Sequence, residues 1–130
     1  MSQENVDLVQ GVLARFIATG ELSWDLMHEE IEVHDHDIMD AGEYRGHLDF
    51  ARWLENWGAA WADFSIEPEE FLDAGTGVVS VFRMKATGQG SGVAIERQDA
   101  MVWKVRGGKI TRLDYYNDRG QALKAVGLKE

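Results

Sequence analysis

The spacing of apolar residues predicts two long amphipathic helices in the first half of the chain. In residues 6–17 the apolar positions recur every three or four residues, and Thr19-Gly20 ends the pattern. A second helix is predicted from about residue 47 to 62, where five large apolar residues follow the same spacing. Its predicted buried face consists of Phe50, Trp53, Leu54, Trp57 and Trp61, four of which are aromatic.

The remaining segments are typical of β-strands. Ser23 can cap a short helix through Met27, and residues 31–36 have the pattern of a strand. After Pro68 the chain is rich in strand-forming residues, and glycine-rich turns separate four segments. They are Glu70–Asp73, Val78–Thr87, Val93–Val105 and Ile110–Tyr116, and a last helix follows between a cap at Asp118 and a stop at Gly127. This order predicts one α+β domain over residues 1–130, with a curved sheet and helices on one face.

Alternation along residues 93–105 places two charged residues toward the core. The odd positions are apolar except for Arg97 and Asp99, and strand geometry puts them all on one face. The even positions form a mixed face that meets water or another subunit. Apolar residues interrupt that outer face, which predicts a homodimer that pairs through it; they are Ala94, Ala100 and Val102.

The turn at Gly107-Gly108 decides which residues of the last strand join that inner face. If it is a two-residue hairpin turn, Asp114 and Tyr116 lie beside Arg97 and Asp99. A three-residue loop reverses the faces and brings Leu113 and Tyr115 inside. Glycine pairs favour the two-residue turn.

The segment Glu32 to Asp37, EVHDHD, places two histidines among three acids. Alternation directs Asp35 toward the core with Ile31 and Val33, and it directs His34 and His36 to the opposite face. A metal there would need a third ligand, which Glu32 alone could supply. We therefore expect a solvated or subunit-facing strand edge, with no metal and no cofactor.

Composition narrows the classes of partner. The 23 acidic residues outnumber the 13 Lys and Arg, and the net charge of −10 disfavours binding to nucleic acid or to an anionic membrane surface. No apolar run approaches the roughly 20 residues of a membrane span, and the first residues lack a signal-peptide pattern, so we expect a cytoplasmic protein. The chain has no cysteine, which excludes thiol nucleophiles and thiolate metal sites.

The whole chain resembles the SnoaL-like family of the nuclear-transport-factor-2-like superfamily. The resemblance lies in LVQGVLARFIATGELS, IEVHDHDI, the EYRGH helix entry and AMVWKVRGGKITRLDYYNDRGQALKAVGL. It implies a cone of curved sheet and helices around an apolar pocket, and commonly a dimer through the outer sheet face. The superfamily includes polyketide cyclases, ketosteroid isomerases and limonene-epoxide hydrolases, so the fold alone does not fix the chemistry.

The resemblance also suggests roles for particular residues. Asp35 falls at the general-base aspartate of ketosteroid isomerases and Asp99 near the acid of their oxyanion hole, although Leu13 replaces their helix-one tyrosine. Limonene-epoxide hydrolases suggest Arg97 bridging Asp99 and Asp114, with Val33 and Asp35 in place of their water-holding tyrosine and asparagine. The final-strand aspartate of polyketide cyclases matches either Asp114 or Tyr115.

Together these patterns predict a small-molecule pocket protein with cofactor-independent acid/base chemistry on a mostly apolar substrate that carries an oxygen. The predicted catalytic residues are Asp35, Arg97, Asp99 and Asp114, and the predicted ligand-binding residues are Phe16, Trp53, Trp57, Met101, Trp103 and Tyr116. The alternatives are a binder of a small hydrophobic ligand and a dimeric interaction domain, neither with turnover. Purely structural roles are also possible for these residues. Arg97 and Asp99 could form a salt bridge, and Asp114 and Tyr116 a hydrogen-bonded pair. The stripe of Trp53, Trp57 and Trp61 could serve only to pack the core.

Overall fold

The computed structural model describes residues 2–36, 42–75 and 77–128 of the 130-residue chain. Its helices are α1 (Ser2–Thr19), α2 (Gly46–Ala59) and α3 (Arg119–Ala125), with a short 3₁₀ helix η1 (Trp24–Leu26). Its strands are β1 (Met27–Asp35), β2 (Glu43–Arg45), β3 (Trp61–Asp73), β4 (Gly77–Gly88), β5 (Ala94–Arg106) and β6 (Lys109–Tyr116). The cap at Asp118 is confirmed, because its side chain accepts a hydrogen bond from the Gly120 N–H.

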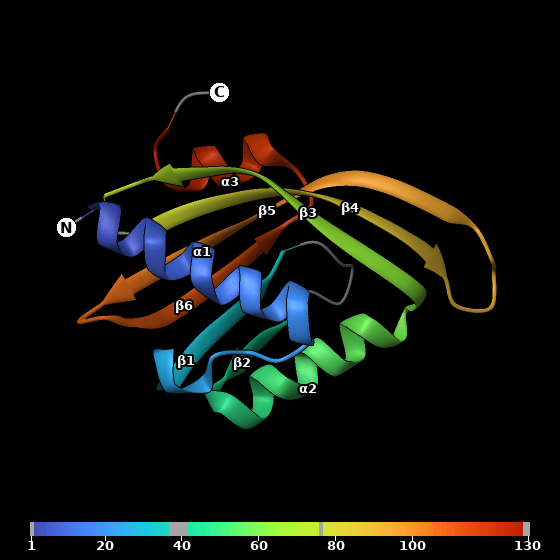
Figure 1. Ribbon diagram of the computed structural model, residues 1–130, viewed down its shortest axis with the longest axis horizontal. Helices are drawn as coiled ribbons and strands as arrows, with labels where there is room; N and C mark the ends of the chain where they lie inside the picture. The colour runs from blue at the N-terminus through green and yellow to red at the C-terminus, as the bar shows by residue number, and fades with distance from the viewer. Residues whose placement is uncertain (1, 37–41, 76, 129–130) are drawn as a thin grey trace.

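Six strands form one mixed sheet in the order β2-β1-β6-β5-β4-β3. The β1–β6 pair is parallel and the other pairs are antiparallel. Helices α1 and α2 cover one face of the curved sheet, and α3 lies across the opposite face (Figure 1). This arrangement confirms the α+β class and the cone-shaped fold, but the prediction that every helix packs on one face is wrong for α3.

The long strand β3 begins at Trp61, nine residues before the predicted start at Glu70. Most of its side chains are exposed, so it lacks the alternation of apolar and polar residues that marks a half-buried strand. It is an edge strand, where Pro68 can stay because one side of the strand needs no hydrogen-bonding partner. The predicted second helix is correspondingly shorter and ends at Ala59.

Apolar side chains pack on both faces of the sheet. The main core lies between the sheet and helices α1 and α2, and it includes Val9, Ile31, Phe50, Phe82 and Leu113. On the outer face, Ala100 and Val102 are buried beneath Ala122 and Leu123 of α3. The premise that these two residues present apolar surface to a partner is therefore wrong, whereas Ala94 is exposed. The homodimer stays a prediction.

The β5–β6 hairpin contains the predicted two-residue turn and, next to it, a bulge. Arg106 pairs with Lys109 across Gly107-Gly108, and both glycines have positive φ, +60° and +78°, as this turn type requires. Val105 pairs with Ile110, but Lys104 pairs with Arg112, which leaves Thr111 as an extra residue. From Arg112 onward each side chain therefore changes face relative to the prediction.

The faces of β6 follow from that bulge. Leu113 pairs with Trp103 and Tyr115 with Met101, so Leu113 and Tyr115 lie on the inner face. Asp114 pairs with Val102 on the outer face, and Tyr116 lies on that face too. The prediction that these two join Arg97 and Asp99 is therefore wrong, although the turn itself is the predicted one.

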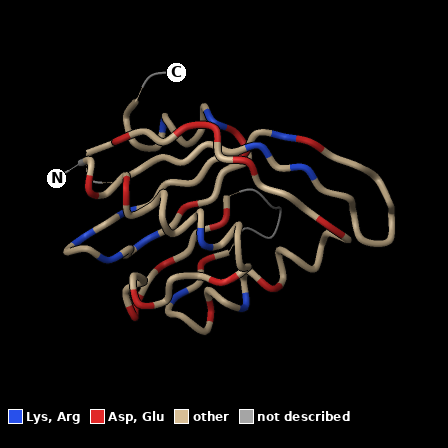
Figure 2. The backbone as a smooth tube through the Cα atoms, viewed as in Figure 1, with Lys and Arg blue, Asp and Glu red and all other residues tan. Residues whose placement is uncertain are grey.

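Charged residues are scattered along the chain, and basic residues gather at the β5–β6 turn (Figure 2). Those at the turn are Lys104, Arg106 and Lys109. Among the residues that the structure describes, no helix is long and apolar enough to cross a membrane. The expectations that the protein does not bind nucleic acid and that it is cytoplasmic stay predictions.

The close pairing of β4 and β5 generates a stability test at Gly77. A Cβ atom there would lie 2.6 Å from the backbone oxygen of Trp103, so Gly77→Ala should lower the free energy of unfolding by about 1 to 3 kcal/mol. At Gly11 in α1 a Cβ meets nothing within 4 Å, so Gly11→Ala should stabilise by up to about 1 kcal/mol. Urea unfolding measures both variants, and equal stabilities would contradict the close approach of the two strands.

Candidate functional site

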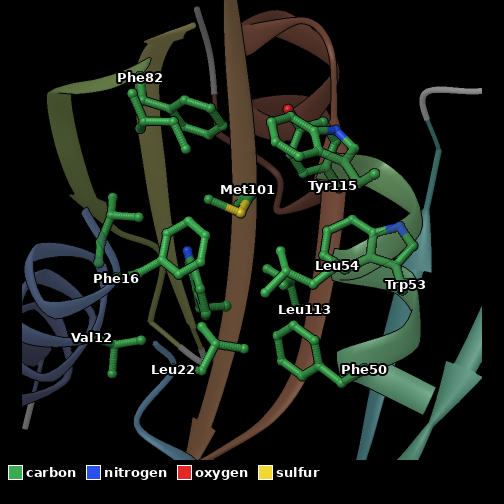
Figure 3. Close-up of a pocket in the computed structure, with 14 residues that line it drawn as sticks. Val12, Phe16, Leu22, Phe50, Trp53, Leu54, Phe82, Met101, Leu113 and Tyr115 are labelled. Carbon is green, nitrogen blue, oxygen red and sulfur yellow. The ribbon is translucent and has the colours of Figure 1, made fainter. Parts of the chain in front are cut away.

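An apolar cavity of about 40 Å³ lies between the sheet and helices α1 and α2. Figure 3 shows side chains converging on it from α1, α2 and the inner strands. Five of the six residues predicted to bind ligand line it: Phe16, Trp53, Trp57, Met101 and Trp103. The other lining residues include Leu54, Phe82, Leu113 and Tyr115. Trp53 and Trp57 of α2 thus belong both to the core and to the cavity wall, whereas Trp61 lies on β3 and does not line the cavity.

The cavity is small compared with sites for small molecules. Its volume corresponds to about three water-sized spheres, whereas ligand pockets usually measure about 300 to 1,000 Å³. Its lining is apolar, and the indole N–H of Trp103 is already bonded to Ser80 Oγ at 2.9 Å. As it stands, the cavity accommodates only a slender apolar group.

A larger cleft of about 510 Å³ adjoins the cavity. Trp53 and Trp57 line both spaces, so the floor of the cleft is the wall of the cavity. Asp35 and Arg97 bring opposite charges to the cleft. The remaining lining residues are Tyr44, Asn56, Ala60, Trp61 and Asn117. The cleft therefore combines aromatic walls with a carboxylate, a guanidinium and two side-chain amides.

Asp35 ends β1 and points to the inner face, as alternation along the strand predicts. It is 3% exposed, and its Oδ2 accepts a hydrogen bond of 2.8 Å from Trp53 Nε1. Trp53 lies on α2, so this bond fixes the carboxylate against the helix that walls the cleft. The burial places a carboxylate at the boundary between the polar cleft and the apolar core.

Asp99 lies deeper, and Arg97 and Tyr115 hold its carboxylate. Arg97 Nε donates to Oδ1 at 2.8 Å, and the Tyr115 hydroxyl donates to Oδ2. Asp99 is fully buried, whereas about a third of the Arg97 side chain is exposed. Burial and the adjacent Asp99 charge raise the pKa of Tyr115, so this phenol stays protonated and remains a donor. The inward direction of Arg97 and Asp99 is confirmed.

Asp114 and Tyr116 lie on the other side of the sheet. Arg112 donates two hydrogen bonds to Asp114, at 2.8 and 2.9 Å, and His36 Nε2 lies 2.8 Å from Asp114 Oδ1. The His36 ring stacks on Tyr116 with centroids 4.5 Å apart. The predicted arrangement of Arg97 between Asp99 and Asp114 is therefore wrong, and so is the predicted place of Tyr116 in the pocket.

This outer cluster keeps Asp114 ionised. Burial opposes ionisation, but the hydrogen bonds from Arg112 and His36 outweigh it and lower the pKa of Asp114. His34 lies against Glu32 at 3.1 Å and Glu43 at 3.3 Å. The outward direction of His34 and His36 is confirmed. Within residues 2–36, 42–75 and 77–128 no three potential ligands converge on a metal position.

Sequence reasoning missed several residues of the inner site. Tyr115 was expected inside only if a longer loop reversed the faces, and the resemblance left it as an alternative to Asp114, because a bulge leaves no clear sequence signal. Asn56 and Asn117 bring amides to the cleft from α2 and from the segment after β6. Tyr44 reaches it from β2. Neither periodicity nor a motif indicates that these three positions meet.

The Arg97–Asp99 pair predicts a strong asymmetry between single and double substitutions. Arg97→Met should lower the free energy of unfolding by about 3 to 5 kcal/mol, because it removes a cation from a fully buried carboxylate. Adding Asp99→Asn should recover most of the lost stability, because the neutral amide oxygen can still accept a hydrogen bond from the Tyr115 hydroxyl. Urea unfolding of both variants checks this, and a single variant as stable as the wild type would contradict it.

The lowered pKa of Asp114 predicts that the protein loses part of its stability on the acid side. A carboxyl with a folded pKa below its ordinary 3.8 stabilises the fold above that value, and the effect is lost as pH falls through the folded pKa. Asp114→Asn should therefore lose less stability than the wild type between about pH 6 and pH 2. Urea unfolding across pH measures this, with Asp118→Asn at the exposed cap of α3 as the control. Identical pH dependence in wild type and Asp114→Asn would contradict the assignment.

Comparisons with known proteins agree with the fold. Among curated proteins no sequence matches the chain. TerC co-crystallized with polyporic acid is 19% identical with a TM-score of 0.74, over 95% of this chain and 98% of that chain. A nuclear-transport-factor-2-like protein from Burkholderia xenovorans LB400 is 24% identical with a TM-score of 0.75, over 98% of each chain. A protein from Jannaschia sp. CCS1 that is described as a putative SnoaL-like polyketide cyclase is 15% identical with a TM-score of 0.74, over 99% of this chain and 95% of that chain. The family model of the SnoaL-like domain matches residues 14–113, and the chain therefore belongs to the SnoaL-like family.

Proposed function

We propose that the protein binds a small, mostly apolar molecule with an oxygen function and catalyses a proton transfer on it without a cofactor. One observation carries the proposal: Asp35 and Arg97 line the same aromatic cleft, and its floor is the wall of an apolar cavity. A carboxylate can take a proton from carbon, and a guanidinium can stabilise the negative charge that results.

The reaction that this pair supports is enolisation. Asp35 removes the proton from the carbon next to a carbonyl group, and the electron pair moves to the carbonyl oxygen. Arg97 stabilises that oxygen as its charge develops. If the substrate has a carbon–carbon double bond conjugated with the enolate, return of the proton to its far carbon gives an isomer. If the enolate carbon attacks a second carbonyl, a ring closes and the new alkoxide takes the proton from Asp35. Both outcomes need the same two residues.

Asp99 and Tyr115 act in this proposal as positioning residues. Both Asp99 oxygens accept hydrogen bonds, one from Arg97 and one from Tyr115, and the Asp99 side chain is fully buried. Asp99 and Tyr115 together fix the Arg97 guanidinium in the wall of the cleft. A mechanism with Arg97 between Asp99 and Asp114 is not supported, because Asp114 lies on the outer face. The geometry therefore favours isomerase or cyclase chemistry over epoxide hydrolysis of that type.

Two further observations support an organic ligand with an oxygen function. The indole Nε1 of Trp61 is buried and has no hydrogen-bond partner among the described residues, and Trp61 lines the cleft. A ligand oxygen that reaches this N–H would satisfy it. One similar structure contains polyporic acid and another is described as a putative polyketide cyclase, which is consistent with this class of ligand.

A binder without turnover is the second candidate, and the small cavity favours it. A volume of about 40 Å³ leaves most of a ligand in the cleft, where it is only partly removed from water. Such a protein would hold the ligand without performing the proton transfer. An exchange experiment separates the two functions, because only a catalyst moves a proton between carbon and solvent.

We expect 2-hexanone to exchange its α-protons for deuterium in the presence of the protein in D₂O, as followed by ¹H NMR. Asp35→Asn should slow exchange by about 100-fold or more, while affinity changes by less than about tenfold, because the carboxylate acts in the transition state. Asp114→Asn makes the same change on the outer face, and it should catalyse the exchange of 2-hexanone at the wild-type rate. Binding without exchange would favour the non-catalytic function, and equal rates for both variants would remove Asp35 as the base.

A further inference from the structure

A groove of about 550 Å³ runs along the outside of the apolar cavity, between α1 and α2. Three residues line both the groove and the cavity: Phe16 near the end of α1, Leu22 just after it, and Leu54 on α2. Two other spaces therefore adjoin the cavity. It meets the polar cleft through Trp53 and Trp57 and the groove through the other three residues.

These two neighbours lie on different sides of the cavity. In Figure 3, Phe16 and Leu22 lie on one side, Trp53 lies on the opposite side, and Leu54 lies between them. The cleft and the groove therefore adjoin the same apolar cavity from different directions.

Helix packing explains why the groove exists. Helix α1 packs on β3 and β4, whereas α2 packs mainly on β1 and β2. The seam between the helices is filled by side chains such as Leu54, which is only partly buried. A change of rotamer at Leu54 can widen this seam without moving the sheet or either helix backbone.

The chemistry of the groove selects a neutral apolar group. Its floor is formed by Phe16, Leu22, Trp24, Leu54 and Phe64. Its charged rim is mixed in sign, with Arg15 3.8 Å from Glu21 and with Glu55 nearby. A rim of this kind gives a charged ligand group little net attraction, whereas the floor favours hydrocarbon.

We propose that the groove is a second opening of the ligand site and receives the apolar tail of an elongated ligand. The oxygen-bearing head lies in the cleft beside Asp35 and Arg97, and the tail passes Leu54 through the cavity. A cavity of about 40 Å³ admits a slender alkyl chain and excludes a fused ring system. This proposal rests on the proposed function, because it extends the ligand of the same site.

Gly58 allows the groove to be blocked without disturbing the fold. It lies on α2 and lines the groove, and a Cβ atom there meets nothing within 4 Å. Gly58→Phe should therefore fill the groove while α2 keeps its place. Gly11→Phe is the matched control, because Gly11 is also helical with open space around it and does not line the groove. Gly58→Met provides a smaller block if the phenylalanine variant unfolds.

The experiment measures the affinity of linear methyl ketones from 2-butanone to 2-undecanone, by quenching of tryptophan fluorescence. In the wild type and in Gly11→Phe, affinity should rise about fourfold with each added CH₂ as the tail fills the cavity and the groove. In Gly58→Phe the rise should stop at medium chain length, so that 2-undecanone binds at least about tenfold more weakly than to the wild type. 2-Butanone should bind equally to all three proteins.

The outcomes separate this inference from the proposed function. If short ketones bind and exchange through Asp35 but Gly58→Phe keeps the full chain-length dependence, the second opening is wrong and the proposed function stands. If the chain-length dependence changes as expected but no ketone exchanges, the groove is supported and catalysis is wrong. If no ketone binds to the wild type, both proposals are overturned.

Discussion

The carboxylate of Asp99 imposes the strictest physical requirement on this fold. It is fully buried, and an ion without partners in an apolar core costs several kcal/mol. Arg97 supplies a charge and one donor from the same strand, and Tyr115 supplies the second donor from the neighbouring strand. Tyr115 can do so only because the bulge at Thr111 turns it inward. The inner site therefore depends on one extra residue in β6.

The same bulge divides the charged residues between two chemically different clusters. On the inner face, Arg97 is held by Asp99 and lines a cleft that also contains Asp35. On the outer face, Asp114 is satisfied by Arg112 and His36 and has no route to the cavity through the sheet. Without the bulge, Asp114 would lie inside, and repulsion between buried carboxylates would add to their loss of solvation. Separation of the acids removes that repulsion and leaves Asp35 as the acidic side chain that lines the cleft.

Sequence patterns predicted what depends on local periodicity and missed what depends on register or on tertiary contacts. The inward directions of Asp35, Arg97 and Asp99 follow from alternation within single strands, and in the structure all three side chains lie on the inner face. The faces of Asp114 and Tyr116 depended on counting residues across a hairpin, where one bulged residue reverses every later position. The start of β3 was missed because an exposed edge strand buries too few side chains to show a period of two. Asn56 and Asn117 come to the same cleft only in the folded chain.

The size of the cavity links the packing of the core to the kind of ligand the site can hold. Large aromatic side chains fill the cone, so the enclosed space is far smaller than a typical ligand pocket, yet adjoining spaces of about 510 and 550 Å³ lie on two sides of it. A compact ligand would have to displace several tightly packed rings, and cores resist such changes. A slender chain displaces fewer side chains, and some of those beside the cavity, such as Leu54, are only partly buried. In the proposed function, close packing of the aromatic core therefore favours an elongated ligand, and Asp35 and Arg97 act on its oxygen-bearing group.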